Sequence, residues 1–119
     1  MPLEPVFHNR VRVIDIDGTV VRKKPPEEYF TTPTVALPGA IERVNKWFAN
    51  GDYIIFWTAR PNEYKQRTMD ILDELGFNYH ELICGKPYTH KMHFYDDIPV
   101  LVVHRVMRDK GIGDHRRKR

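Results

Sequence analysis

Cysteine is nearly absent from this sequence, and that scarcity limits the architecture before any motif is considered. The 119 residues include a single cysteine, Cys84. One thiol excludes a framework of disulfides within the chain and agrees with a reducing compartment. We interpret Cys84 as a small buried apolar residue at the end of a strand.

Long apolar runs and a leader pattern are also missing. No stretch approaches the roughly 20 apolar residues that cross a bilayer. Residues 1–5 do not begin the basic and then apolar pattern of a secretory signal. We therefore expect a cytoplasmic protein with no membrane partner. Repeats are absent as well, and the length suits one domain over residues 1–119.

Charge is close to balanced except at the carboxyl end. The formal net charge is +3, and four positive charges lie within the last five residues, His115 to Arg119. We treat residues 112–119 as a basic tail, although charged termini are more often solvated ends than binding sites. Because basic runs attract polyanions, contact with nucleic acid through this tail stays open, but no aromatic residue is interleaved for stacking.

Several short apolar runs predict strands. The run 11–16 is rich in β-branched residues and ends at Asp17-Gly18, which predicts a strand followed by a turn. Residues 53–57 are apolar on both faces, which is typical of a central parallel strand with helices on either side. Further strands are predicted at 79–84 and, briefly, at 92–95.

Helical spacing marks the segments between these runs. Apolar residues recur at helical intervals after Pro38, and Gly51 ends that pattern. A second amphipathic helix is predicted over residues 62–75. For residues 98–110 the pattern allows a helix or a strand, and we choose the helix because Pro99 and Gly111 suit its two ends. Residues 19–37 carry three prolines and predict a loop or flap.

This order predicts an α/β protein with a Rossmann-like parallel sheet of four or five strands flanked by helices. Ligands of such sheets bind beyond the carboxyl ends of the strands. Polar residues follow three of the predicted strands at that edge: Asp15, Asp17, Thr58, Asp96 and Asp97. We therefore expect side chains from distant parts of the sequence to meet there.

The stretch 15–20 is the most informative part of the sequence. Strand side chains alternate, so the carboxylates of Asp15 and Asp17 are expected to project together where the backbone turns. Turn formation explains Asp17 and Gly18. It does not explain Asp15, because a carboxylate in an apolar strand is costly unless it is paired or binds a cation. We therefore favour a chemical role for Asp15.

Asp15-Ile16-Asp17-Gly18-Thr19-Val20 resembles the first motif of the haloacid dehalogenase superfamily in its phosphatase form. Ile54 to Thr58 is similar to the second motif, an apolar strand that ends in a phosphate-binding hydroxyl residue. Lys86 resembles the lysine of the third motif, with Lys91 as the competing choice. Asp96-Asp97 resembles the acidic fourth motif. The four motifs occur in the family's order and span residues 11–97.

The resemblance implies a magnesium-dependent phosphatase. Asp15 would attack the phosphorus and form an aspartyl-phosphate, while Asp17 would act as general acid and then as general base. Mg²⁺ would be held by Asp15, the backbone carbonyl of Asp17 and Asp96, with Asp97 reaching it through water or orienting Lys86. Three groups would bind the phosphate: the Thr58 hydroxyl, the backbone amide of Ala59 and the Lys86 ammonium.

Arg60 and the histidines receive no firm role from the sequence. Arg60 follows Thr58 closely, which leaves open whether it contacts substrate or forms a surface ion pair. The six histidines show no shared metal spacing.

The segments that would hold a separate cap domain, residues 19–37 and 60–84, are short. The resemblance therefore implies a capless member with an open site. Such members accept large substrates or borrow a cover from another subunit, so a homo-oligomer stays open. Residues 83–88 and 94–97 are locally similar to small sugar-phosphatase-like proteins encoded among capsule polysaccharide genes.

The leading hypothesis is hydrolysis of a small phosphorylated metabolite such as a sugar phosphate. One alternative is a polynucleotide 3′-phosphatase, which the basic tail supports. Another is a non-catalytic module that binds a phosphorylated partner. The presence of Asp17 beside Asp15 argues against that module, because binding alone does not need both carboxylates.

Overall fold

The computed structural model describes residues 7–113, in which three strands form one parallel sheet. The strands are β1 (Val11–Ile14), β2 (Tyr53–Trp57) and β3 (Glu81–Ile83), each shorter than or equal to its predicted run. They lie in the order β1-β2-β3, with Ile14 opposite Phe56 and Trp57 opposite Ile83. The predicted α/β class with a parallel sheet is confirmed.

Two α-helices connect these strands, at the positions that the apolar spacing predicts. The helix α1 (Ala40–Ala49) joins β1 to β2, and α2 (Lys65–Leu75) joins β2 to β3. Short 3₁₀ turns precede them, η1 (Pro26–Glu28) in the loop after β1 and η2 (Asn62–Tyr64) at the start of α2. The loop predicted over residues 19–37 is therefore a loop with one 3₁₀ turn.

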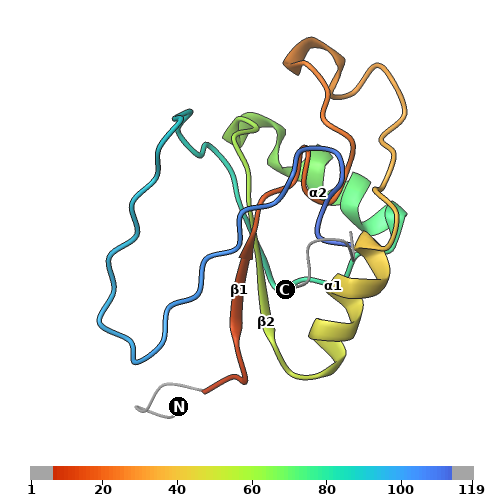
Figure 1. Ribbon diagram of the computed structural model, residues 1–119. Coiled ribbons are helices and arrows are strands. Elements are labelled where there is room, and N and C mark those ends of the chain that lie inside the picture. Colours follow the sequence, from red (N-terminus) through yellow and green to blue (C-terminus); the bar gives the residue numbers. More distant parts are fainter. Residues whose placement is uncertain (1–6, 114–119) are drawn as a thin grey trace.

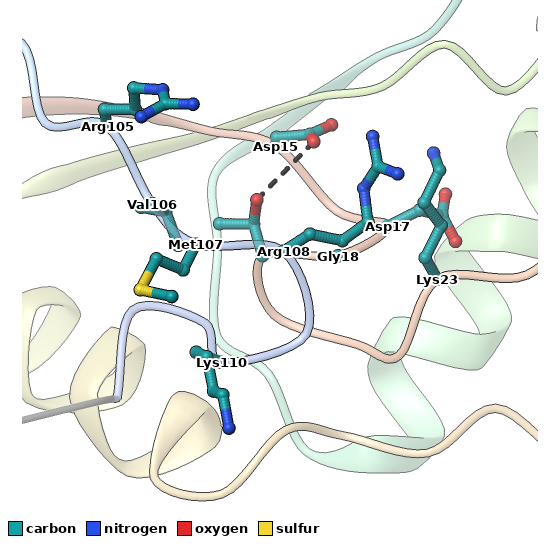
Figure 2. A pocket seen from close by; sticks show the side chains of 10 residues that line it. Asp15, Asp17, Gly18, Lys23, Arg105, Val106, Met107, Arg108 and Lys110 are labelled. Carbon is teal, nitrogen blue, oxygen red and sulfur yellow. Dashed lines mark hydrogen bonds between the residues drawn. The ribbon is translucent and has the colours of Figure 1, made fainter.

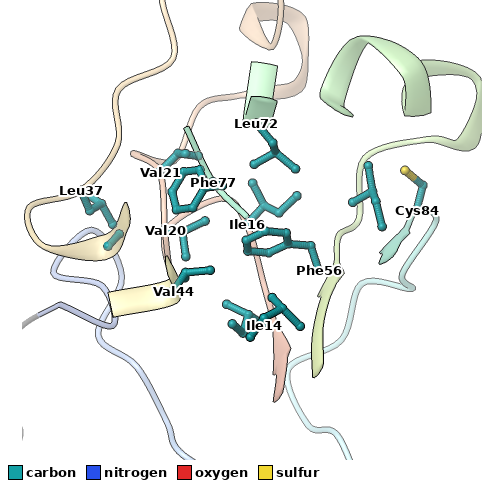
Figure 3. Packing of buried hydrophobic residues seen from close by; sticks show 13 residues of the cluster. Ile14, Ile16, Val20, Val21, Leu37, Val44, Phe56, Leu72, Phe77 and Cys84 are labelled. Atoms are coloured by element: carbon teal, nitrogen blue, oxygen red, sulfur yellow. The ribbon is translucent and has the colours of Figure 1, made fainter. Parts of the chain in front are cut away.

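Both helices cover the same face of the sheet (Figure 1). The topology explains this arrangement, because right-handed crossovers that step in one direction leave their helices on one side. The core lies between the two layers (Figure 3) and contains side chains that are at most 6% exposed: Ile14, Ile16, Val44, Phe56 and Leu72. The described chain thus has one helical layer and one sheet layer.

The other face of the sheet carries no helix among residues 7–113, which corrects the expectation for β2. Side chains along β2 alternate between buried and partly buried, so only one of its faces is fully covered. On β1, Val11 and Val13 are 61% and 48% exposed. A strand that is apolar on both faces can be covered by helices on both sides. Whether a second layer of helices is present depends on the rest of the chain.

Residues 84–113 contain neither a helix nor a strand. The strand predicted at 92–95 and the helix predicted over 98–110 are therefore wrong, and the sheet has three strands in the described part of the chain rather than four or five. Side chains from Pro87 to Arg105 are exposed, so an element there would have no core surface to pack against. The β-branched residues near Val100 also disfavour a helix.

Cys84 follows β3 and is 7% exposed, which confirms its interpretation as a buried residue. Burial raises the pKa of its thiol. No helix within residues 7–113 is long and apolar enough to cross a bilayer. The predicted basic tail, apart from Ile112 and Gly113, lies outside the described residues.

Candidate active site

Asp15 and Asp17 lie just beyond the carboxyl end of β1, where the backbone makes a tight turn. Three successive N–H groups, of residues 19–21, donate to the carbonyl oxygen of Ile16. Gly18 adopts a φ of 88°, a left-handed conformation that glycine reaches without strain. The predicted turn is confirmed, and it leaves Asp15 40% exposed while Asp17 is 9% exposed.

Lys86 contacts Asp15 although 71 positions separate the two residues in sequence. The Lys86 Nζ atom lies 2.9 Å from Asp15 Oδ1. Hydrogen bonds that continue the pairing of β2 and β3 past the strands bring it there. Thr58 N–H donates to the Ile83 carbonyl and Lys86 N–H donates to the Thr58 carbonyl, both at 2.9 Å. The competing choice, Lys91, is exposed and forms no ion pair within residues 7–113.

Arg60 binds both carboxylate oxygens of Asp17. Its Nε atom lies 3.0 Å from Oδ2 and its Nη2 atom lies 2.9 Å from Oδ1. The Arg60 side chain is 1% exposed, and its Cζ atom lies 4.4 Å from the centre of the Tyr29 ring. The sequence left Arg60 open between a substrate contact and a surface pair, and the structure places it in a buried ion pair.

A sequence signal for this pair does exist. Arg60 follows β2 and Asp17 follows β1, and the ends of neighbouring parallel strands meet at one edge of the sheet. The third guanidinium nitrogen of Arg60, Nη1, is buried and has no hydrogen-bond partner within the described residues. A buried donor without a partner costs free energy.

The loop after β1 holds the ring that stacks on Arg60. Lys24 Nζ donates to the carbonyl oxygens of Tyr29 and Thr32, at 3.1 and 2.8 Å. Burial, and next the charge of Arg60, lowers the pKa of Lys24. Burial, and next the charge of Asp17, raises the pKa of Tyr29 to about 12. Lys24 therefore holds the loop in a conformation in which the Tyr29 ring packs against the Arg60 guanidinium.

Thr58 is 1% exposed and supports the turn that leads to Arg60. Its Oγ1 atom accepts a hydrogen bond of 3.1 Å from the Arg60 backbone N–H. Ala59 is partly buried beside it. Neither residue lines the hollow in front of Asp15. The role of Thr58 and Ala59 in phosphate binding stays a prediction.

Asp96 and Asp97 lie in the exposed segment that follows β3. The Asp96 Oδ1 atom accepts a hydrogen bond of 3.0 Å from the Ile98 backbone N–H. In the described part of the chain, no three histidine, cysteine, aspartate or glutamate side chains form a group that could hold a metal ion. The structure thus brings Asp15 and Asp17 together without Asp96 and Asp97, whose role as metal ligands stays a prediction.

Asp15 has one oxygen that suits a divalent cation. Oδ1 is bound to Lys86, whereas Oδ2 receives only a long contact of 3.5 Å from the Thr19 hydroxyl among residues 7–113. Mg²⁺ prefers oxygen ligands and is commonly held by one or two carboxylates, with water and substrate phosphate completing its shell. The donors at the end of β1 therefore fit Mg²⁺, with Asp15 as the side chain that would hold it.

A hollow of about 780 Å³ opens in front of the two carboxylates (Figure 2). The turn after β1 and the segment near the carboxyl end line it: Asp15, Asp17, Gly18, Thr19, Lys23, Arg105, Val106, Met107, Arg108 and Lys110. Sites for small molecules occupy roughly 300–1,000 Å³. The hollow is large enough for a metabolite and not only for a phosphate ion.

Known proteins resemble this chain in sequence and in structure. A protein of Bacillus cereus described as "Putative nucleotidase" is 32% identical over 74 residues, which cover 60% of this chain and 39% of that relative's length. A crystal structure from Vibrio cholerae aligns with a TM-score of 0.54 at 20% identity, over 74% of this chain and 79% of the other. Likeness at that identity shows a shared fold alone.

A family model described as "PITM 1-3, LNS2 domain" matches residues 12–101. The matched range contains both carboxylates after β1, both lysine candidates and the Asp96-Asp97 pair. LNS2 domains have a fold like that of haloacid dehalogenase phosphatases, in agreement with the sheet order and the placement of Asp15. Since the match extends over most of the sequence, the chain belongs to the LNS2-domain family.

Proposed function

We propose that this protein is a magnesium-dependent phosphomonoester hydrolase in which Asp15 is the nucleophile. One observation carries the proposal: Asp15 directly follows the parallel strand β1, remains 40% exposed and has a lysine Nζ 2.9 Å from one oxygen. A phosphoryl group that approaches Asp15 therefore meets both a carboxylate nucleophile and a positive charge. Family membership and the nucleotidase-like relative support the broader class, a phosphatase-type hydrolase.

The proposed reaction has two halves. A carboxylate oxygen of Asp15 attacks the phosphorus and forms an aspartyl-phosphate, while the alcohol leaves with a proton from Asp17, which enters this step in its protonated form. Water then attacks the same phosphorus and gives a proton to Asp17. This second step releases phosphate and restores both carboxyl groups to their starting states.

Arg60 acts as a positioning residue in this scheme. Both oxygens of Asp17 are bound to its guanidinium, at 3.0 and 2.9 Å. To exchange a proton with the substrate, Asp17 has to release one of these two bonds. The remaining bond keeps the carboxylate in place, which preserves the geometry on which general acid and base catalysis depends.

Mg²⁺ would be held by Asp15, the backbone carbonyl of Asp17 and Asp96, and it would offset the repulsion between the carboxylate and the phosphoryl group. Lys86, the Thr58 hydroxyl and the backbone amide of Ala59 are the proposed donors to the phosphoryl oxygens. Lys86 is already at the site, while Asp96 belongs to the exposed segment. Asp97 would reach the metal through a water molecule or would orient Lys86.

The proposed substrate is a small phosphorylated metabolite. A sugar phosphate follows from the sequence resemblance, and a nucleoside monophosphate follows from the nucleotidase-like relative. We also propose that the site works without a cap domain of its own. The segment between β1 and β2 contains a loop with one 3₁₀ turn and the helix α1, and the segment between β2 and β3 contains η2 and α2.

Phosphate release from an aryl phosphate and from a panel of metabolites, with and without Mg²⁺, tests the proposal. We expect Asp15→Asn to lower kcat at least about 1,000-fold, because it removes the nucleophile. Asp70→Asn is the matched control, since Asp70 is an exposed carboxylate on α2 outside the hollow. An Asp15→Asn protein as active as the control would refute the proposal.

A further inference from the structure

Four more cationic side chains line the hollow in front of Asp15. Lys23 comes from the loop after β1, and the other three come from the carboxyl-terminal segment: Arg105, Arg108 and Lys110. All four are exposed. None of them forms an ion pair with a carboxylate within residues 7–113. We call these four residues the basic wall.

The charges of the basic wall exceed what one phosphate neutralises. Asp15 and Asp17 are already paired with Lys86 and Arg60. A phosphate monoester carries a charge of about −2 near neutral pH, and Asp109 adds one negative charge within the same segment. About one positive charge would therefore remain, before any Mg²⁺ is added. A concave surface lined by one sign of charge attracts ligands of the opposite sign. A substrate with a second anionic group matches this surplus.

Hydrogen bonds fix the segment that carries three of these cations. Asp109 N–H donates to the Gly18 carbonyl at 2.9 Å, and Asp109 Oδ1 accepts a 2.8 Å hydrogen bond from Lys23 N–H. Ile112 N–H donates to the Thr19 carbonyl at 3.1 Å. The segment is therefore attached to the same turn that presents the two carboxylates.

The backbone of this segment is also unusual. Asp109 has a φ of 62°, and Gly111 has a φ of 77°. A Cβ atom on Gly111 would lie 2.7 Å from the Thr19 carbonyl oxygen. A left-handed backbone is unfavourable for a residue other than glycine, and such strain persists where the surrounding contacts hold it. The basic wall is thus a defined part of the site.

Arg108 is the member of the basic wall whose side chain points toward the two carboxylates, although it forms no ion pair with them. Its side chain extends over Gly18 toward them in Figure 2, and its Cγ atom lies 3.2 Å from where a Cβ on Gly18 would be. Arg105 and Lys110 also line the hollow. In Figure 2 the Lys110 side chain extends away from the two carboxylates. These residues lie beyond the range 12–101 that the family model matches, so family membership does not account for them.

We propose that the basic wall is a second anion subsite that selects small phosphate esters with a further phosphate group. The inference rests on the proposed function, in which the first phosphate is placed against Asp15. The second phosphate then contacts Arg105 and Arg108, with Lys23 and Lys110 beside them. The volume of about 780 Å³ accommodates a bisphosphorylated sugar or nucleoside.

A matched pair of ligands tests the subsite: a nucleoside 3′,5′-bisphosphate and the corresponding 5′-monophosphate. The test variant is Arg105→Gln/Arg108→Gln. The control is Lys46→Gln/Lys65→Gln, which removes the same charge from exposed positions on α1 and α2. Circular dichroism checks that each variant is folded.

We expect the wild type to prefer the bisphosphate at least about tenfold in kcat/KM, since a charge-assisted hydrogen bond contributes about 1.5–3 kcal/mol. The test variant should lose this preference, because its kcat/KM for the bisphosphate should fall at least about tenfold more than its kcat/KM for the monophosphate. The control should retain it. A wild type without preference, or an equal loss for both ligands, overturns the subsite. Activity that rises with oligonucleotide length instead of with the second phosphate also overturns it.

A binding measurement distinguishes failure of the subsite proposal from failure of the proposed function. Isothermal titration uses Asp15→Asn protein, which is not expected to turn over either ligand. The subsite predicts tighter binding of the bisphosphate, lost in the Asp15→Asn/Arg105→Gln/Arg108→Gln protein, even if the wild type hydrolyses nothing. Added salt should weaken bisphosphate binding more than monophosphate binding, because it screens exposed charges. Equal affinities for the two ligands would overturn the inference.

Discussion

Arg60 and Asp17 form a buried bidentate ion pair across the ends of two neighbouring parallel strands. The two side chains are 1% and 9% exposed, and 43 sequence positions separate them. Both charges have thus lost most of their water. Such a pair contributes little net stability by itself, but removing one member leaves the other as an uncompensated buried charge.

Arg60→Met should therefore destabilise the protein by about 3–5 kcal/mol, measured by urea unfolding. Arg67→Met is the matched control, because Arg67 also lies over an aromatic ring, 3.9 Å from the centre of Phe30, but is exposed. Its loss should stay below about 1 kcal/mol. Arg60→Met/Asp17→Leu should recover part of the loss, since neither buried charge remains. Equal losses for Arg60→Met and Arg67→Met would contradict a buried pair.

Lys86 and Lys91 provide a test of which lysine serves the site. Lys86 Nζ lies 2.9 Å from Asp15, whereas Lys91 is exposed and pairs with no carboxylate in residues 7–113. Lys86→Met should lower kcat/KM for an aryl phosphate about 100-fold or more, because it removes a charge at the reacting group. Lys91→Met should leave kcat/KM unchanged. The reverse order of effects would assign the role to Lys91.

The elements of the fold that the sequence predicts correctly depend on local signals. The helix α1 begins after Pro38 and ends before Gly51, and α2 ends at Leu75, just before Gly76. Proline and glycine thus mark these helix ends within a few residues. The strands β1 and β2 are apolar runs bounded by polar residues. The turn at Asp17-Gly18 is likewise encoded by residues next to each other in sequence.

Residues 98–110 show where local signals are insufficient. Pro99 and Gly111 suit the ends of a helix, but the segment has no surface of the core to pack against. Gly111 instead lies where the backbone approaches Thr19, a contact between residues far apart in sequence. The sequence does not decide the role of Arg60 for the same reason. Its pairing with Asp17 exists only once β1 and β2 are adjacent. Tertiary contacts decide both cases.

Gly111 and Gly76 allow the attachment of the basic wall to be measured. Both have left-handed backbones, with φ of 77° and 95°, so alanine is strained at either position. A Cβ added at Gly76 would meet no atom of residues 7–113 within 4 Å beyond its chain neighbours, whereas at Gly111 it would meet the Thr19 oxygen at 2.7 Å. Gly76→Ala should cost about 1 kcal/mol. Gly111→Ala should cost more and should speed hydrogen exchange at the Asp109 and Ile112 amides. Identical behaviour of the two variants would show that this segment is not tightly attached.

Magnesium binding depends on Asp15 in the proposed site, and thermal unfolding can detect it without any substrate. A cation that binds only the folded state stabilises it, by about 2.7 kcal/mol at 100 times the dissociation constant. Mg²⁺ should therefore raise the Tm of the wild type by several degrees. Asp15→Asn should abolish the rise, because Oδ2 of Asp15 is the open carboxylate oxygen at the end of β1.

The same measurement on Asp96→Asn tests whether Asp96, which lies in the exposed segment after β3, is a metal ligand. If Asp96 joins the metal, as we propose, its variant should need a higher Mg²⁺ concentration for the same rise in Tm. Asp70→Asn, an exposed carboxylate on α2, should behave like the wild type. An Asp96→Asn protein that matches Asp70→Asn would leave the cation to Asp15, the Asp17 carbonyl and water, a shell that still suits Mg²⁺. A wild type whose Tm does not respond to Mg²⁺ would instead remove the metal from the proposed reaction.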